Sequence, residues 1–457
     1  MSDLREPSLP PDGPSPRPSR VPAGTSRAHR ALAYALRPIA RVDAGEVVTA
    51  LVMTFTVFVL LTSYYILKTA REPLILMQGG AEVKQYASAG QCLLLIPVVR
   101  AYGALAKRVG RMKLVGGVYA FFFVNLLLFA FLSWREVRLG VVFYLWVGIF
   151  NVTVIAQFWS FANDIYTPEQ GKRLFAVLGI GSSVGAVAGA RIAKLLVKAG
   201  PPTMMLVAAG LLVACIGLLA FVEARQGRAH AHAKDDEPEA PLGGEQMFRT
   251  LMRDRYLLAI GALTLLLNWV NHAGEYMIDR ALLDSAHAGA LAAGVTETQF
   301  VGIFKAEYLS YYSIGGVVLQ LFAVSRIMRI AGVRRALFLL PLVSFVGYAA
   351  IVAFPVLRVV QATKVAENAL DYSLQNTVRN ALFLVTGRVE KYVGKAIIDT
   401  VLMRAGDVLA AVTVAIGAWL SLSLRTFALI NVVLTAFWVL SVVVVGREHR
   451  KKSPEHA

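Results

Sequence analysis

Stretches of about 20 mostly apolar residues recur along the chain from residue 46 onward, and no other feature limits its possible folds as strongly. A helix of this length crosses a hydrocarbon core of about 30 Å. Composition agrees, because 57% of the 457 residues are hydrophobic and only 16% are charged. We therefore predict an all-α membrane protein with about twelve transmembrane helices. The expected spans are 46–70, 84–105, 113–133, 138–162, 174–198, 202–223, 256–278, 299–324, 334–353, 355–385, 399–422 and 425–446.

The net charge of +17 could indicate nucleic-acid binding, but its distribution favours a topological role. Basic residues concentrate in alternate connections between the expected spans, which is the positive-inside pattern of cytoplasmic loops. This pattern predicts a multi-pass protein of the cell inner (plasma) membrane, with both termini in the cytoplasm and no nucleic-acid partner. The basic residues are Arg37, Arg41, Lys107, Arg108, Arg111, Lys113, Lys172, Arg173, Arg225, Arg228, Arg326, Arg329, Arg334, Arg335, Arg388, Lys391, Lys395, Arg447, Arg450, Lys451 and Lys452.

Composition shifts divide the chain into five parts. Residues 1–45 begin with a stretch rich in Pro, Ser and Arg, which predicts a disordered basic cytoplasmic tail without a cleavable signal peptide. A charged, Pro-containing stretch at 225–250 breaks the apolar pattern midway, so it predicts a cytoplasmic linker. We expect this linker to join an N-terminal six-helix half at 46–224 to a C-terminal six-helix half at 251–446, with a second cytoplasmic tail at 447–457.

Ionisable and polar side chains recur every three or four residues within one expected span. They are Lys364, Glu367, Asp371, Gln375 and Arg379. On an α-helix this spacing places them in one stripe. Ionised groups are costly at bilayer depth unless they face a bundle interior or a water-filled cavity, where they usually mark a pathway for substrate or ions. We therefore interpret this helix as a wall of a transport pathway.

Two connections that lie six spans apart are alike. Residues 102–113 and 323–335 are both basic, both contain Gly, and each joins two expected spans at the cytoplasmic face. They resemble the loop between helices 2 and 3 of the major facilitator superfamily, although Lys107 stands where that motif usually has an acid. The resemblance implies two parallel six-helix halves around a central cavity.

Four further segments carry a more specific resemblance when they are taken together. They are Tyr65 to Leu74 with Gly80 to Val83, Phe158 to Asn163 with Lys172 to Gly181, Asn271 to Glu275, and Asp371 to Leu374 with Lys391 to Asp399. In this order and spacing they are similar to the ATP/ADP translocase family, the nucleotide exchangers of plastids and intracellular bacteria. The resemblance implies antiport of nucleotides by alternating access, with ATP and ADP as the favoured pair and no cofactor.

The family resemblance also implies particular site residues. Its substrate cavity has a base on the first helix, acids on the fourth and seventh, and a base on the tenth. By position these fall on Arg71, on an apolar position near Val147, on Glu275 and on Arg379. The acid of the fourth helix is therefore missing, and the nearest polar residue, Asn151, is neutral.

A phosphate-bearing anion in a low-dielectric passage needs cationic partners, because Arg and Lys give it strong charge-assisted hydrogen bonds. The bases in or beside the expected spans are Lys68, Arg71, Lys305, Lys364 and Arg379, and the acids that would balance them in an empty site are Glu72, Glu275, Glu307 and Asp371. Asn271 shares a helical face with Asn268 and Glu275. The candidate substrate-binding residues are therefore Arg71, Glu275, Arg379, Lys68, Asp371, Lys364 and Asn271.

Some of these features have simpler structural explanations. Arg71 and Glu72 could form an interfacial ion pair at the outer end of the first helix, where charge is cheap. The face that carries Glu275 could instead make polar contacts between helices. Lys305 and Glu307 are two residues apart, so at most one of them faces the cavity. The rings of Tyr308, Tyr311 and Tyr312 could stack an adenine, but aromatic clusters in membrane helices more often serve packing.

Other motifs point away from catalysis. Gly181, Gly185 and Gly189 follow one another at intervals of four, which predicts close helix packing rather than a dinucleotide fingerprint. The sequence contains no phosphate-binding loop, zinc ligand set or paired-carboxylate pattern, so we do not expect an enzyme. Two other functions remain open: a proton-coupled carrier of another organic anion with Glu275 or Asp371 as the proton site, and a membrane scaffold or sensor that does not transport.

Overall fold

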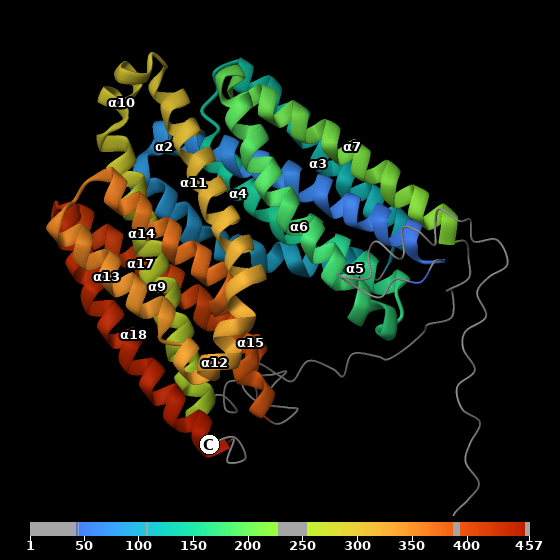
Figure 1. Cartoon of the computed structure of the whole chain (residues 1–457). Coiled ribbons are helices and arrows are strands. Elements are labelled where there is room, and N and C mark those ends of the chain that lie inside the picture. Colours follow the sequence, from blue (N-terminus) through green and yellow to red (C-terminus); the bar gives the residue numbers. More distant parts are fainter. Residues whose placement is uncertain (1–42, 44, 107, 227–253, 387–393, 453–457) are drawn as a thin grey trace, which may run out of the picture.

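The computed structural model describes residues 43, 45–106, 108–226, 254–386 and 394–452. Within these ranges the chain is helical apart from short connections (Figure 1). The two residues 43 and 45 are the described part of the predicted N-terminal tail, and most of the predicted linker at 225–250 lies outside the described residues, as do Lys107, Arg388 and Lys391.

The described part of the first half contains six helical runs. Its longest element, α2 (Val47–Ala106), is two membrane helices joined at Gly80, whose φ of +81° and ψ of 179° suit a residue without a Cβ. The other elements are α3 (Arg111–Trp134), α4 (Gly140–Phe150) continued by the π-helix η1 (Asn151–Ile155) and by α5 (Ala156–Ile165), α6 (Pro168–Leu196) continued by η2 (Val197–Ala199), and α7 (Gly200–Gln226).

The described part of the second half also contains six runs, with the short helix α10 (Ala286–Ala293) between the first two. They are α9 (Arg255–Asp284), α11 (Glu297–Leu319) continued by η3 (Gln320–Val324) and α12 (Ser325–Ala336), α13 (Leu339–Ala353), α14 (Leu357–Leu370) continued by η4 (Asp371–Gln375), α15 (Asn376–Leu382) and η5 (Phe383–Val385), α16 (Lys395–Ile397) continued by η7 (Ile398–Leu402) and α17 (Met403–Trp419), and α18 (Leu424–Lys452). We call the end of the bundle at α10 the α10 end, and the end where α18 finishes the tail end (Figure 1).

Local signals explain where several of these helices begin. Thr167 and Thr296 each form a capping box with the Gln three residues later, so α6 and α11 start at these threonines. Asp254 caps α9 by accepting a hydrogen bond from the backbone N–H of Tyr256 at 2.8 Å.

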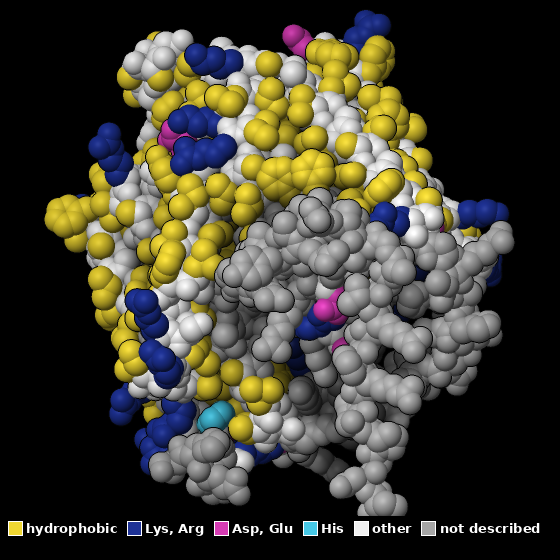
Figure 2. Space-filling model, turned by 45° about the vertical axis from the view of Figure 1, so that its right-hand side comes forward, with side chains coloured by type: hydrophobic (Ala, Val, Ile, Leu, Met, Phe, Trp, Pro, Cys, Tyr) yellow, Lys and Arg dark blue, Asp and Glu magenta, His cyan; other side chains and the backbone are white. Residues whose placement is uncertain are grey.

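The apolar side chains are arranged as the membrane prediction requires. Eight helical stretches of the described chain are long and apolar enough to cross a membrane, and α2 holds two consecutive spans. Hydrophobic side chains cover much of the described surface, and Lys and Arg gather near the lower end of the view (Figure 2). The buried side chains form one core from the first half and another mainly from the second. The structure therefore confirms the all-α membrane fold in two six-helix halves.

The first helix is longer than the predicted span 46–70. It remains helical up to Gly79, and Ile75 and Leu76 of the added turns are buried. Residues 72–76 of these turns are packed against other parts of the protein, whereas Gln78 near their end is exposed. As a result Arg71 and Glu72 lie inside the molecule and not at its outer edge.

The predicted glycine ridge packs α6 directly on α2. A Cβ on Gly181, Gly185 or Gly189 would lie 2.5–2.6 Å from the backbone oxygen of Thr54, Phe58 or Thr62 respectively. Only glycine allows two backbones to approach this closely. The contact holds the first and fifth spans of the first half together.

We predict that Gly185→Ala destabilises the protein by about 1–3 kcal/mol, because its methyl group would overlap the carbonyl of Phe58. Thermal unfolding in detergent measures the effect. Gly179→Ala is the matched control, since it lies on the same helix and a Cβ there would have no neighbour within 4 Å. Equal unfolding temperatures for the two variants would contradict the proposed close packing.

Candidate functional site

A cavity of about 250 Å³ lies between the two halves in the middle of the bundle. Its walls come from α2, α4, α9, α11, α14 and η4, so both halves contribute. Five of the predicted site residues line it: Lys68, Arg71, Asn271, Glu275 and Asp371. Side chains that the sequence places more than 300 positions apart therefore meet in one cavity.

Lys364 lies directly behind this cavity wall. Its ammonium group is fully buried and lies 2.9 Å from a carboxylate oxygen of Glu367 and 3.8 Å from one of Glu275. It also donates a hydrogen bond to the backbone oxygen of Asn271 at 3.1 Å. Tyr348 donates to the same oxygen of Glu367 at 2.8 Å. Lys364 thus links α14 to α9. Its ion pair with Glu275 connects it to the cavity wall.

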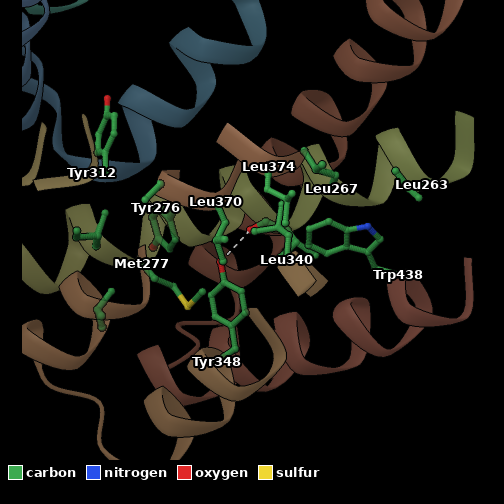
Figure 3. Close-up of a cluster of buried hydrophobic side chains, with 14 of the residues drawn as sticks. Leu263, Leu267, Tyr276, Met277, Tyr312, Leu340, Tyr348, Leu370, Leu374 and Trp438 are labelled. Carbon is green, nitrogen blue, oxygen red and sulfur yellow. Dashed lines mark hydrogen bonds between the residues drawn. The ribbon is translucent and has the colours of Figure 1, made fainter. Parts of the chain in front are cut away.

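The surroundings of Tyr348 explain why that carboxylate needs these donors. Figure 3 shows the Tyr348 ring in a cluster of buried apolar side chains that includes Met277, Leu340 and Leu370. An unpaired carboxylate among such neighbours would be costly. Lys364 and the hydroxyl of Tyr348 both bind its Oε2, whereas its Oε1 is buried without a hydrogen-bond partner in the described part of the chain.

Glu275 is held by neutral groups as well as by charge. Its Oε1 accepts hydrogen bonds from the Tyr308 hydroxyl at 2.5 Å and from the Asn368 amide at 3.0 Å. Asn368 also accepts a bond from Asn271 at 3.2 Å. The two explanations for this helical face are therefore compatible, because Glu275 joins helices and also lines the cavity.

Arg379 is not in the cavity wall. Its guanidinium lies 3.9 Å from Asp399 of η7, on the tail-end side of Asp371. The prediction of one continuous stripe from Lys364 to Arg379 is wrong, because the helix changes to a π-helix at η4 (Asp371–Gln375). A π-helical turn is wider than an α-helical turn, so the residues beyond it point in a different direction.

A second group of charged residues joins the two halves, one to two turns inside the α10 end. Lys84 of α2 donates to Glu72 at 2.6 Å and to Asp279 of α9 at 2.7 Å. Lys305 of α11 also pairs with Asp279, and its Nζ lies 3.6 Å from Glu72. Arg71 pairs with Glu72 at 3.2 Å. We call Arg71, Glu72, Lys84, Asp279 and Lys305 the inter-half network.

The sequence reasoning missed two members of this network. Lys84 stands at the first position of an expected span, where a Lys is unremarkable. Asp279 continues the polar face of α9 at a spacing of four from Glu275, but the expected span ended at 278. Extending the helical count by one turn would have found it.

Lys305 and Glu307 point in different directions, as the spacing predicted. Lys305 lines the cavity, whereas Glu307 pairs with Lys194 of α6 at 2.6 Å. The Lys194–Glu307 pair also joins the halves, but both of its side chains are partly exposed. It should therefore contribute little to stability.

Tyrosines form much of the remaining wall. The rings of Tyr312 and Tyr372 are stacked, with their centroids 5.5 Å apart and their planes 7° from parallel. Tyr144 lies under the Arg71 guanidinium at 4.4 Å. Tyr308 also lines the cavity, whereas Tyr311 does not. The fourth run thus offers Tyr144 to the cavity, while Val147 is buried in the core of the first half.

Two cavity groups lack an ionic partner in the described part of the chain. Lys68 donates a hydrogen bond to the Tyr312 hydroxyl at 2.9 Å but forms no direct ion pair. Asp371 forms neither an ion pair nor a side-chain hydrogen bond. A charged ligand or a proton would therefore gain the most binding free energy at these two side chains. The described residues contain no cluster of three or more His, Cys, Asp or Glu able to hold a metal ion.

We predict that Asp279→Asn lowers stability by about 3–5 kcal/mol, because Lys84 and Lys305 would lose a buried countercharge. Glu307→Gln is the matched control: it also removes a carboxylate from a pair between the halves, but an exposed pair contributes only about 0–1 kcal/mol. Unfolding in detergent compares them. Similar losses in the two variants would show that the inter-half network is not desolvated.

Comparison with known proteins defines the fold of the chain but not its family or its substrate. No protein-family profile matches the chain, and no curated protein matches it in sequence. Similar solved structures include the nucleoside transporter NupG, at a TM-score of 0.63 and 11% identity over 87% of this chain and 98% of that one. A POT family transporter in complex with 5-aminolevulinic acid gives 0.61 and 11% over 89% and 96%. A bacterial homologue of the human lysosomal transporter Spinster, inward-facing and unoccupied, gives 0.57 and 12% over 88% and 97%. The chain has the fold of the major facilitator transporters.

Proposed function

We propose that the protein is a membrane transporter that exchanges nucleotides, ATP for ADP, by alternating access. The observation that carries the proposal is the position of Lys68 and Arg71, three residues apart on α2, which both line a cavity between the halves. Lys68 makes no direct ion pair with any described residue, and the guanidinium of Arg71 binds Glu72 through its Nε. Their remaining donors suit phosphate oxygens.

The tyrosines beside Lys68 support a cargo with a planar ring. Aromatic side chains stack on the faces of bases with little regard for sequence. The four motif segments that resemble the ATP/ADP translocase family support the same cargo, and the solved nucleoside and small-molecule transporters that share the fold are compatible with it.

Exchange rather than one-way transport follows from the charge balance of the site. In an empty cavity Lys68 makes no direct ion pair with a described residue in the low-dielectric middle of the bundle, which is unfavourable. A bound anion removes this cost, so reorientation is easier when the site is loaded in both directions. We further propose that the protein lies in the cell inner membrane with both termini in the cytoplasm, on the strength of its basic loops.

We predict ATP uptake into proteoliposomes preloaded with ADP, and a loss of about 2–5 kcal/mol of binding free energy in Lys68→Ala or Arg71→Ala. Lys replacement of Arg71 should be milder, because it keeps the charge. Lys194→Ala is the control, as it removes a partly exposed cation outside the cavity. Wild-type exchange in both cavity variants would reassign Lys68 and Arg71 to structural roles.

One observation favours a second candidate, a proton-coupled carrier of another organic anion. Asp371 lines the cavity and makes no direct ion pair with the residues that the structure describes, whereas Glu275 already accepts two hydrogen bonds. A carboxyl group that makes no direct ion pair or hydrogen bond is the better proton acceptor of the two.

A pH gradient separates the candidates. If the protein is an exchanger, an imposed gradient should leave wild-type uptake unchanged, and Glu275→Gln should change only the affinity for the anion. A proton-coupled carrier would be accelerated by the gradient, and Asp371→Asn should abolish that acceleration while equilibrium exchange continues, because Asn mimics the protonated acid. Strong acceleration of the wild type would overturn the exchanger. No counterflow with ATP, ADP, phosphate or a dicarboxylate would favour a scaffold or sensor.

A further inference from the structure

A second cavity, of about 320 Å³, adjoins the charged one on its tail-end side. It lies between α2 and α6 of the first half and α11, η3, η4 and α15 of the second. Tyr312 and Tyr372 line both cavities. The two spaces therefore share a wall, and one ligand of sufficient length could occupy both.

The chemistry of the two cavities differs sharply. The charged cavity is lined by Lys, Arg, Glu and Asp side chains, whereas none of the described residues around the second cavity is ionised at neutral pH. The second cavity instead offers hydroxyl and amide groups. They belong to Ser182, Ser183, Ser313, Gln320, Asn376 and Thr377.

The amides are available for a ligand. Gln320 makes no side-chain hydrogen bond in the described part of the chain, and Asn376 only accepts one through its Oδ1, from Asn380 at 3.4 Å. Both residues are exposed and line the second cavity. An Asn or Gln amide presents a donor and an acceptor side by side, which matches the edge of a heterocyclic base.

Lys68 connects the two spaces. Its ammonium lies 5.4 Å from the ring centre of Tyr65, which lines the second cavity, and 5.6 Å from that of Tyr312, which lines both. A group bound at Lys68 therefore sits at the junction. A substrate with an anionic group at one end and an uncharged ring at the other would fit both cavities at once.

We propose that the second cavity is the base-binding subsite of the transporter, where Asn376 and Gln320 contact the edge of a nucleobase and the Tyr312–Tyr372 pair contacts its face. Lys68 and Arg71 hold the phosphates in the charged cavity. This inference rests on the proposed nucleotide exchange. It adds the location at which the specificity for the base is determined. A base that matches the amides less well is selected against, because it leaves polar groups unpaired.

The test separates base contacts from phosphate contacts. Binding of ATP and of inorganic tripolyphosphate, which has no base, is measured to purified wild type, Asn376→Ala, Gln320→Ala and Lys68→Ala. Loss of one hydrogen bond should weaken ATP about tenfold in Asn376→Ala or Gln320→Ala, with tripolyphosphate unchanged within about twofold. Lys68→Ala should weaken both ligands.

Asn125→Ala is the matched control, because Asn125 of α3 donates to the backbone oxygen of Phe121 on its own helix at 2.8 Å and lines neither cavity. Equal losses of ATP and tripolyphosphate affinity in Asn376→Ala and Gln320→Ala, or no loss of either, would overturn the base subsite and leave nucleotide exchange standing. A wild type that binds tripolyphosphate but not ATP, or binds neither, would overturn the proposed function and the subsite with it.

Discussion

Ionised side chains buried among apolar helices remain charged only where opposite charges or hydrogen bonds replace the water that they lose. This constraint organises the middle of the molecule. Lys84, Lys305 and Lys364 are buried, and each of them contacts a carboxylate. The apolar cores of the halves are largely separate, so the charged layer between them fixes how one half sits against the other. Apolar contact alone would not fix it, because lipid tails are as apolar as the side chains.

The two charged groups differ in what a relative movement of the halves does to them. Lys364, Glu367, Glu275 and Tyr308 all belong to the second half, so this group would move as one unit. The inter-half network has members on both sides, and opening the α10 end would pull it apart. Charges released there need water or a ligand as replacement partners, which couples the occupancy of the cavity to the position of the halves.

The general fold could be predicted from the sequence because lipid imposes a simple rule of length and hydrophobicity, and the glycine ridge could be predicted because close packing demands small residues. Five cavity residues could also be predicted, because charged and polar side chains at bilayer depth mark a pathway. They are Lys68, Arg71, Asn271, Glu275 and Asp371. Lys84 and Asp279 were missed because each lies at the margin of an expected span. The position of Arg379 could not be predicted, because counting residues around a helix assumes a constant number per turn. The π-helical turn at η4 changes that number before Arg379 is reached.

The wide turn at η4 has a counterpart at η1, in the fourth helical run of the first half. An α-helix rotates about 100° per residue, so a chain that accommodates one extra residue in a π-helical turn keeps the following α-helix in place. Deleting one residue from Asp371–Gln375 would restore the α-helical count and leave Arg379 in its present direction relative to Lys364, because the wide turn is what accommodates the extra residue. In these two helices, a deletion within the wide turn can therefore leave the side chains on both sides of it in place. A relative that is one residue shorter at either turn could thus keep the same cavity, whereas the same deletion in a purely α-helical stretch would rotate the following residues by about 100°.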